Sequence, residues 1–319
     1  MLRSCIRRYS ILALCAALAA LWLPGCGSPA AAKDAEDTFS FVYMSDLQAD
    51  PGARDYTAAG ALLDTALAHE SAPNLLVLGG DTVNDGSSAA EWADFWTAAN
   101  GRLDDVTVAS VPGNHDSEPL LAEQFDYPAA APKTSSEGFF YTFSEGNIFF
   151  LMLDSNIMGG GNATDAEWVS EQLSGRAAKT ADWRIAVSHH PLWPAAEIPK
   201  DVQRAQTIRD VFLPLMEKGG VDLVLCGHQH VYARTAPMPA EGAAESGLLQ
   251  VMAASGAKGS YVPGDMEYVV TTADAPNYLV LEAGAETLKI TAFDSAGKPF
   301  DSALIDSALI GSRAGGSGR

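Results

Sequence analysis

Histidine, cysteine and basic residues are all scarce in this chain. Its 319 residues include 6 His, 4 Cys and 20 Lys and Arg against 40 Asp and Glu, which gives a formal net charge of −20 at pH 7. A surface with so few cations repels polyanions, which argues against a protein that binds the nucleic-acid backbone. We therefore expect no specific nucleic-acid binding.

Long apolar runs are also missing, apart from one near the N-terminus. Residues 11–23 form an apolar stretch of 13 residues, whereas a helix that spans a bilayer needs ~20. Arginines precede this stretch and small residues follow it, which is the pattern of an export signal. We expect a signal peptide over residues 1–25 and an exported protein of the bacterial cell envelope.

The end of this signal resembles a bacterial lipobox, Leu23-Pro24-Gly25-Cys26, in which the cysteine is lipidated and becomes the first mature residue. We expect the protein to be anchored to the membrane through Cys26; secretion without lipid and a retained membrane helix are the alternatives. A lipidated Cys26 would leave Cys226 without a partner in the mature chain. Cys226 is then expected to be a small buried residue at a strand end, with a metal ligand as the less favoured alternative.

The rest of the chain indicates one large α/β domain. Residues 26–37, rich in Ala, Ser, Pro and acids, are typical of a flexible tether, and strand-like and helix-like segments alternate from residue 38 onward. We expect a domain over 38–295 and a poorly packed tail over 296–319. Within the tail, the first copy of a repeated pentapeptide, 301–305, could extend an edge strand.

Individual elements follow from the apolar patterns. The expected helices lie within 56–69, 89–100, 165–173 and 204–217; a hairpin joins 139–143 to 148–153; and antiparallel strands are expected at 248–253, 277–281 and 287–293.

Polar side chains follow five apolar, β-prone segments, 39–45, 75–78, 106–111, 183–187 and 221–226, at the point where each is expected to end. They are Asp46, Gln48, Asp81, Asn84, Asn114, His115, His189, His228 and His230. In open α/β sheets this edge is where ligands bind. Any one of these residues alone could equally be a turn residue. Together they form a carboxylate, amide and imidazole set without thiolate, which suits divalent Mn, Fe or Zn.

In this order, the five segments resemble the pattern of the calcineurin-like metallophosphoesterase superfamily: D-x-H, G-D-x-x-[ND], G-N-H-[DE], H-x-P and G-H-x-H. The stretch 227–234, Gly-His-Gln-His-Val-Tyr-Ala-Arg, is most similar to the purple acid phosphatase branch. The resemblance covers about residues 38–293. It implies an α/β fold, the metallophosphoesterase four-layer sandwich of two packed mixed β-sheets flanked by helices, and a hydrolase that acts on phosphate esters.

The resemblance also implies a role for each site residue. Asp81 would bridge two divalent metal ions, Mn, Fe or Zn; Asp46 and His230 would bind one of them, and Asn114, His189 and His228 the other. His115 would lie beside the metals without binding them, stabilise the phosphoryl oxygens and protonate the leaving alkoxide while a hydroxide acidified by the metals attacks phosphorus. His190 would have a structural role.

Two positions depart from the family pattern. Gln48 stands where most of the superfamily has histidine. Because an amide oxygen is a weaker donor, the metal at Asp46 should be held more loosely, and whether Gln48 binds it directly or through water stays open. Asn84 stands where purple acid phosphatases have a tyrosine that binds ferric iron, so no purple colour is expected. In many relatives this position orients the catalytic histidine, and we expect Asn84 to orient His115 through its amide.

The favoured function is hydrolysis of a small phosphate monoester. The alternatives are a phosphodiesterase, for example one that acts on cyclic nucleotides, and a catalytically silent metal-containing surface binding protein. Gln48 favours the silent protein and His115 opposes it. Trp193 could form a wall facing the substrate, and Arg234 could contact phosphate or pair with an acid.

Overall fold

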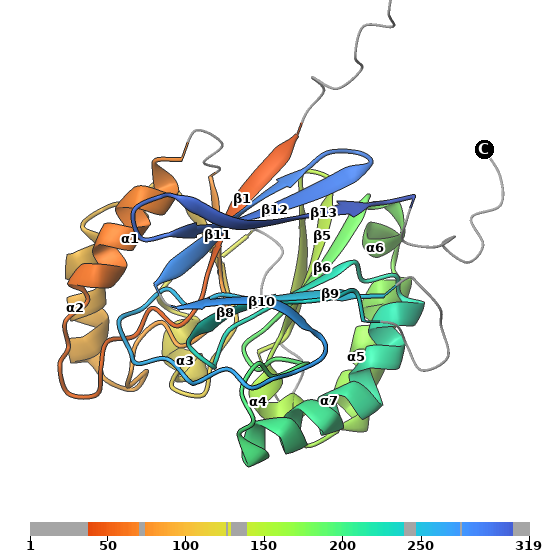
Figure 1. Cartoon of the computed structure of the whole chain (residues 1–319), viewed down its shortest axis with the longest axis horizontal. Helices are drawn as coiled ribbons and strands as arrows, with labels where there is room; N and C mark the ends of the chain where they lie inside the picture. The colour runs from red at the N-terminus through yellow and green to blue at the C-terminus, as the bar shows by residue number, and fades with distance from the viewer. Residues whose placement is uncertain are drawn as a thin grey trace, which may run out of the picture. The chain divides into compact units, whose positions relative to one another are not determined.

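The computed structural model describes residues 38–69, 74–125, 127–128, 139–238, 247–274 and 276–308. They form two mixed β-sheets that pack face to face, with helices on the outer faces (Figure 1). This is the predicted four-layer sandwich. The predicted export signal, Cys26 and the tether lie outside the described residues. Within the described part of the chain, no helix is long and apolar enough to cross a membrane.

The first sheet has six strands in the order β13-β12-β11-β1-β2-β3. Their bounds are β1 Phe39–Met44, β2 Leu75–Leu78, β3 Thr107–Ser110, β11 Asn277–Ala283, β12 Thr287–Asp294 and β13 Pro299–Asp306. β1, β2 and β3 are parallel, and the other pairs are antiparallel. Every residue of β2 is buried, because one face meets the other sheet and the opposite face meets helices.

The second sheet has seven strands in the order β10-β8-β9-β7-β6-β5-β4. Their bounds are β4 Tyr141–Glu145, β5 Ile148–Leu153, β6 Trp183–Ser188, β7 Leu223–Cys226, β8 Val231–Thr235, β9 Leu249–Met252 and β10 Val269–Asp274. The predicted hairpin is β4–β5. β9 was expected to be antiparallel, and it does pair antiparallel with β8. It also lies beside β7, to which it runs parallel, and this pairing was not predicted.

The predicted helices are present as α1 Thr57–Leu67, α2 Ala89–Ala99, α5 Ala163–Ser174 and α7 Pro199–Lys218. α1 and α2 cover the first sheet, and α5 and α7 cover the second (Figure 1). α7 begins earlier than expected because Pro199 suits the first helical turn and Asp201 favours the positive end of the helix dipole. Three shorter helices, too brief to show a period, were not predicted: α3 Glu118–Leu121, α4 Ser155–Met158 and α6 Arg176–Thr180.

The first sheet continues past residue 295, the expected end of the domain. β13 pairs with β12 along the edge, and Ile305 is buried in the core between the sheets. Asp301 of β13 accepts hydrogen bonds from the Tyr232 hydroxyl at 2.6 Å and from Arg234 Nε at 2.7 Å. The first copy of the pentapeptide is therefore an edge strand tied to the second sheet. Arg234 pairs with an acid, the alternative to a phosphate contact.

A carboxyl pair lies where α3 and α4 begin. Glu118 is hydrogen-bonded to Asp154, and burial together with the Asp154 charge raises the pKa of Glu118 to about 7. Since the folded-state pKa lies above the ordinary value, the stability from protonated Glu118 is fully present below about pH 4.3 and is lost as the pH rises through about 7.

Glu118→Gln, which cannot ionise, should therefore stabilise the protein at about pH 8 and have little effect at about pH 4. The gain in the free energy of unfolding should be about 1 kcal/mol, after allowance for solvent screening of this half-exposed group. Thermal denaturation at the two pH values measures it, with Glu123→Gln at an exposed position after α3 as the control. An equal effect at both pH values would show that the pair does not titrate between them.

Candidate metal centre

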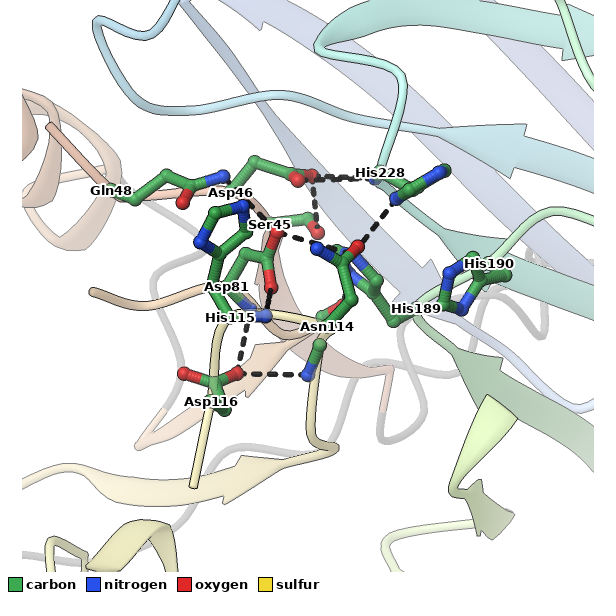
Figure 2. A network of polar contacts seen from close by, with 12 residues as sticks. Ser45, Asp46, Gln48, Asp81, Asn114, His115, Asp116, His189, His190 and His228 are labelled. Carbon is green, nitrogen blue, oxygen red and sulfur yellow. Dashed lines mark hydrogen bonds and ion pairs between the residues drawn. The ribbon is translucent and has the colours of Figure 1, made fainter. Parts of the chain in front are cut away.

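All five predicted polar segments meet at one edge of the sandwich. They follow the carboxyl ends of β1, β2 and β3 in the first sheet and of β6 and β7 in the second. Figure 2 shows Asp46, Asp81, Asn114, His189 and His228 turned toward one another. The structure thus brings together side chains that lie up to 184 residues apart, from Asp46 to His230.

The backbone at this edge is strained where the candidate ligands lie. Asp46, Asp81, His228 and His230 have φ angles of 55°, 53°, 76° and 49°, in the left-handed region that non-glycine residues rarely adopt. Only two other non-glycine residues of the described chain do so. Strain of this kind persists when the surroundings hold it, and it gathers at functional sites.

Close approach of the loops requires glycine at two points. A Cβ at Gly227 would collide with Ser45 and Asp46, and one at Gly113 would collide with Asp81. Half-buried Asp116 accepts hydrogen bonds from the backbone N–H groups of Asp81 at 2.7 Å and Gly113 at 2.8 Å. Burial raises the pKa of Asp116 to about 7. Asp116 therefore holds the loop after β2 against the loop after β3 (Figure 2).

The orientation of two histidines is fixed by groups that only accept hydrogen bonds. His189 Nδ1 lies 2.9 Å from the Gly79 carbonyl oxygen, and His228 Nε2 lies 3.1 Å from Asp201 Oδ1. These nitrogens must therefore carry protons. The other ring nitrogens, His189 Nε2 and His228 Nδ1, then present lone pairs, as metal-binding histidines do.

The lone pairs converge on further acceptors. His189 Nε2 lies 3.3 Å from Asp81 Oδ2, from Asn114 Oδ1 and from His228 Nδ1. Ligand atoms bound ~2.1 Å from one ion are about 3.0–3.4 Å apart, so these spacings fit a shared cation. Without a metal, a proton on His189 can supply the positive charge among these atoms. Burial lowers the pKa of His189, but the Asp81 carboxylate outweighs this effect and raises the pKa to about 9.

A second set of ligand atoms shares Asp81. His230 Nδ1 donates to the Gly259 carbonyl at 3.0 Å, which turns Nε2 toward Asp46 Oδ1 at 3.4 Å. One ligand atom each from Asp46, Asp81 and His230 lie within 4.8 Å of one another, and all three residues are buried. The donors are oxygen and nitrogen only, so the site fits a divalent metal ion.

Gln48 reaches this second set. Its Nε2 lies 3.1 Å from Asp81 Oδ2 and 3.2 Å from His230 Nε2, while its buried Oε1 has no hydrogen-bond partner among the described residues. A half-turn of the amide exchanges the two atoms. It would direct Oε1 at Asp81 and His230, which is the position of a direct ligand.

Gln48→His is expected to tighten the site at Asp46. Imidazole is a stronger donor than an amide oxygen, and zinc favours it, so the weaker of two metal-binding steps should strengthen by about 10-fold and shift toward Zn. Calorimetric titration with Mn and Zn measures this, with Gln124→His, outside the site, as the control. Two equally tight sites with the same metal preference in wild type and variant would contradict a contact between Gln48 and the metal.

His115 is held differently from the prediction. Its Nδ1 lies 2.6 Å from the main-chain carbonyl oxygen of Asn84, whereas the Asn84 amide oxygen is buried without a hydrogen-bond partner among the described residues. The Asn84 side chain therefore does not orient His115; its backbone does. Buried Glu91 fixes this loop by accepting from the N–H groups of Asn84 and Asp85.

Two residues near the site were missed from the sequence, Lys258 and Tyr261. Lys258 Nζ lies 3.0 Å from His115 Nε2, and the Tyr261 ring stacks on His230 at 5.7 Å. Both lie in the loop after β9. A signal was present, because this loop also follows a buried strand and contains glycines, but it carries no histidine, and its two carboxylates come only after Tyr261.

The remaining candidates lie beside the site. His190 Nδ1 contacts the Ser155 hydroxyl at 2.9 Å, and burial lowers the pKa of His190, so it remains neutral. Cys226 is free and buried at the end of β7. Trp193 lines a surface pocket with Val202 and Met266, and no candidate ligand lines that pocket.

Fold and site together define a metallophosphoesterase. The chain belongs to the calcineurin-like phosphoesterase family, whose sequence profile matches residues 39–232.

Individual relatives agree with the resemblance to purple acid phosphatases. Purple acid phosphatase 15 of Arabidopsis thaliana is 28% identical over 155 residues, 44% of this chain and 28% of that protein. The probable cyclic nucleotide phosphodiesterase of Moraxella catarrhalis (strain BBH18) is 29% identical over 222 residues, 64% of this chain and 75% of that protein. The solved structure of purple acid phosphatase PPD1 from yellow lupin (Lupinus luteus) seeds has a TM-score of 0.69 and 17% identity, and covers 85% of this chain and 54% of that one. The chain therefore matches under a third of the length of the Arabidopsis thaliana enzyme and about half of the length of the yellow lupin enzyme.

Proposed function

We propose that this protein is a binuclear metal-dependent phosphoesterase that hydrolyses small phosphate monoesters. One observation carries the proposal: buried Asp81 is close to two groups of ligand atoms, those of Asp46 and His230 and those of Asn114, His189 and His228. A carboxylate with two oxygens can hold two cations ~3.5–4 Å apart.

The ligand set favours Mn, Fe or Zn in both sites. Two such ions would supply Lewis acidity and a water of lowered pKa. The chain's own groups do the rest. Gly79, Asp201 and Gly259 hold the ring orientation of His189, His228 and His230, and His115 stands beside the site to donate a proton to the leaving oxygen.

The local charge supports an anionic substrate. The chain is acidic overall, but two divalent ions with Asp46 and Asp81 would leave about +2 at the site. A small phosphate ester would be attracted at short range, within about a Debye length, while a long polyanion would meet the acidic surface.

Phosphodiester hydrolysis is the second candidate. It is supported by the relative from Moraxella catarrhalis, which bears the name of a cyclic nucleotide phosphodiesterase and aligns with this chain over 75% of its own length. The similarity to purple acid phosphatases favours monoesters.

A substrate panel distinguishes these functions. Mature protein loaded in turn with Mn, Fe and Zn should hydrolyse p-nitrophenyl phosphate with a higher kcat/KM than bis-p-nitrophenyl phosphate and 3′,5′-cyclic nucleotides. A preference for the diesters would establish the second candidate. Hydrolysis of neither class with any metal would identify a metal-containing binding protein instead.

We also propose that the protein is exported and lipid-anchored through Cys26. The apolar stretch 11–23 and the lipobox-like sequence support this. Cys26→Ser should move the protein from the membrane pellet to the soluble fraction or leave it unprocessed, because stable attachment needs two or more acyl chains. Fractionation of the native host measures it. Wild-type protein found wholly in the soluble fraction would contradict the proposal.

A further inference from the structure

We propose that Lys258 is a substrate-binding residue. Together with His115 it binds the phosphate group of a monoester, and it gives the enzyme a preference for monoesters over diesters. The proposal rests on the proposed phosphoesterase function. It starts from one contact: Lys258 Nζ lies 3.0 Å from His115 Nε2.

The hydrogen-bonding roles of His115 and Lys258 follow from the groups that they face. His115 Nδ1 faces a carbonyl oxygen at 2.6 Å and must carry a proton. An ammonium group can only donate and carries three N–H groups. One of them faces His115 Nε2, and the others can reach an anion bound beside it.

The loop that carries Lys258 is fixed to the metal site by its backbone. Ser255 N donates to the Ser45 carbonyl at 2.7 Å, the Gly259 carbonyl accepts from His230 at 3.0 Å, and Tyr261 N donates to the Gln229 carbonyl at 3.2 Å. Anchors on both sides of Lys258 restrict where its side chain can reach. The ammonium is therefore pre-positioned, which strengthens binding because less order is lost when a ligand arrives.

Lys258 also faces the metal ligands. Half-burial lowers its pKa, and the charges of Asp81, Asp46 and Asp50 oppose this effect. Among the residues placed at the site, Lys258 is the one lysine or arginine, and Lys and Arg together number only 20 in the chain. A lone cation at this place is complementary to an anion that the metal ions also attract.

The chemistry of the two ester classes leads to selectivity. A monoester carries up to about two negative charges near neutral pH and has three unesterified oxygens, whereas a diester carries one charge and has two. A fixed ammonium beside His115 matches the additional charged oxygen. Charge-assisted hydrogen bonds of this kind are the strong ones, so their loss should be measurable in substrate affinity.

The test compares Lys258→Met, Lys258→Arg and the control Lys298→Met, which removes an exposed lysine from the turn between β12 and β13. Calorimetry with inorganic phosphate gives affinity without turnover. Lys258→Met should weaken phosphate binding and kcat/KM for p-nitrophenyl phosphate by about 10- to 100-fold, and kcat/KM for bis-p-nitrophenyl phosphate by less than about 3-fold. Lys258→Arg should restore most of the loss, and metal content should be unchanged in every variant.

Several results would overturn the inference. Unchanged phosphate affinity in Lys258→Met, or equal losses on both esters, would mean that Lys258 only positions His115. Loss of bound metal would mean that it supports the site's structure. If the wild type hydrolyses neither ester, the proposed function fails, and the phosphate affinities still show whether Lys258 binds the anion.

Discussion

Asp81→Asn should leave the protein with fewer than two bound metal ions and lower its turnover by about 10³-fold or more. Asp81 is buried and belongs to both groups of ligand atoms, so loss of its charge weakens both sites at once. Bound metals supply several kcal/mol of transition-state stabilisation, and each ~1.4 kcal/mol is worth about tenfold in rate.

The measurement is metal content by mass spectrometry beside initial rates at saturating metal. Asp55→Asn is the matched control, because Asp55 is an exposed carboxylate before α1 and makes an Asx-type contact that asparagine can keep. Two tightly bound metals in Asp81→Asn would show that Asp81 does not bridge them.

His115→Ala should keep its metal and lose turnover by about 10²–10⁴-fold, the usual range for a general acid. No metal-facing contact depends on its ring: Nδ1 is held by the Asn84 carbonyl and Nε2 faces Lys258. The loss should be much smaller for nitrophenyl esters, whose leaving group scarcely needs a proton, than for alkyl esters.

A series of monoesters with leaving groups of graded pKa measures this difference. His69→Ala serves as the control, because His69 lies after the end of α1 and its ring packs on Phe293. If His115→Ala lost metal, or slowed all esters alike, His115 would not be the leaving-group acid.

Much of the site could be predicted because its residues share a local pattern. Each follows a buried strand, and the carboxyl ends of parallel strands meet at one edge whatever the rest of the fold does. Asp81 and His189 lie 108 residues apart and still meet at 3.3 Å. The local pattern alone did not show which of these residues share a metal ion. That assignment came from the order of the five segments, which resembles the family pattern.

Other features could not be predicted because they depend on backbone geometry. The Asn84 carbonyl holds His115, and any residue at position 84 could supply a carbonyl. Lys258 reaches the site because main-chain hydrogen bonds fix its loop. Such bonds require no particular side chain, so the sequence does not predict them. The insertion of β9 beside β7 likewise depends on pairing between distant strands.

The central claim is that one carboxylate joins two metal ions. A crystal structure of the Mn-loaded protein, with anomalous difference maps at the manganese edge, tests it most directly. The account predicts two peaks about 3.5–4 Å apart, one contacted by Asp46 and His230, the other by Asn114, His189 and His228, with Asp81 between them. A single peak at full occupancy, or two peaks that do not share Asp81, would contradict it.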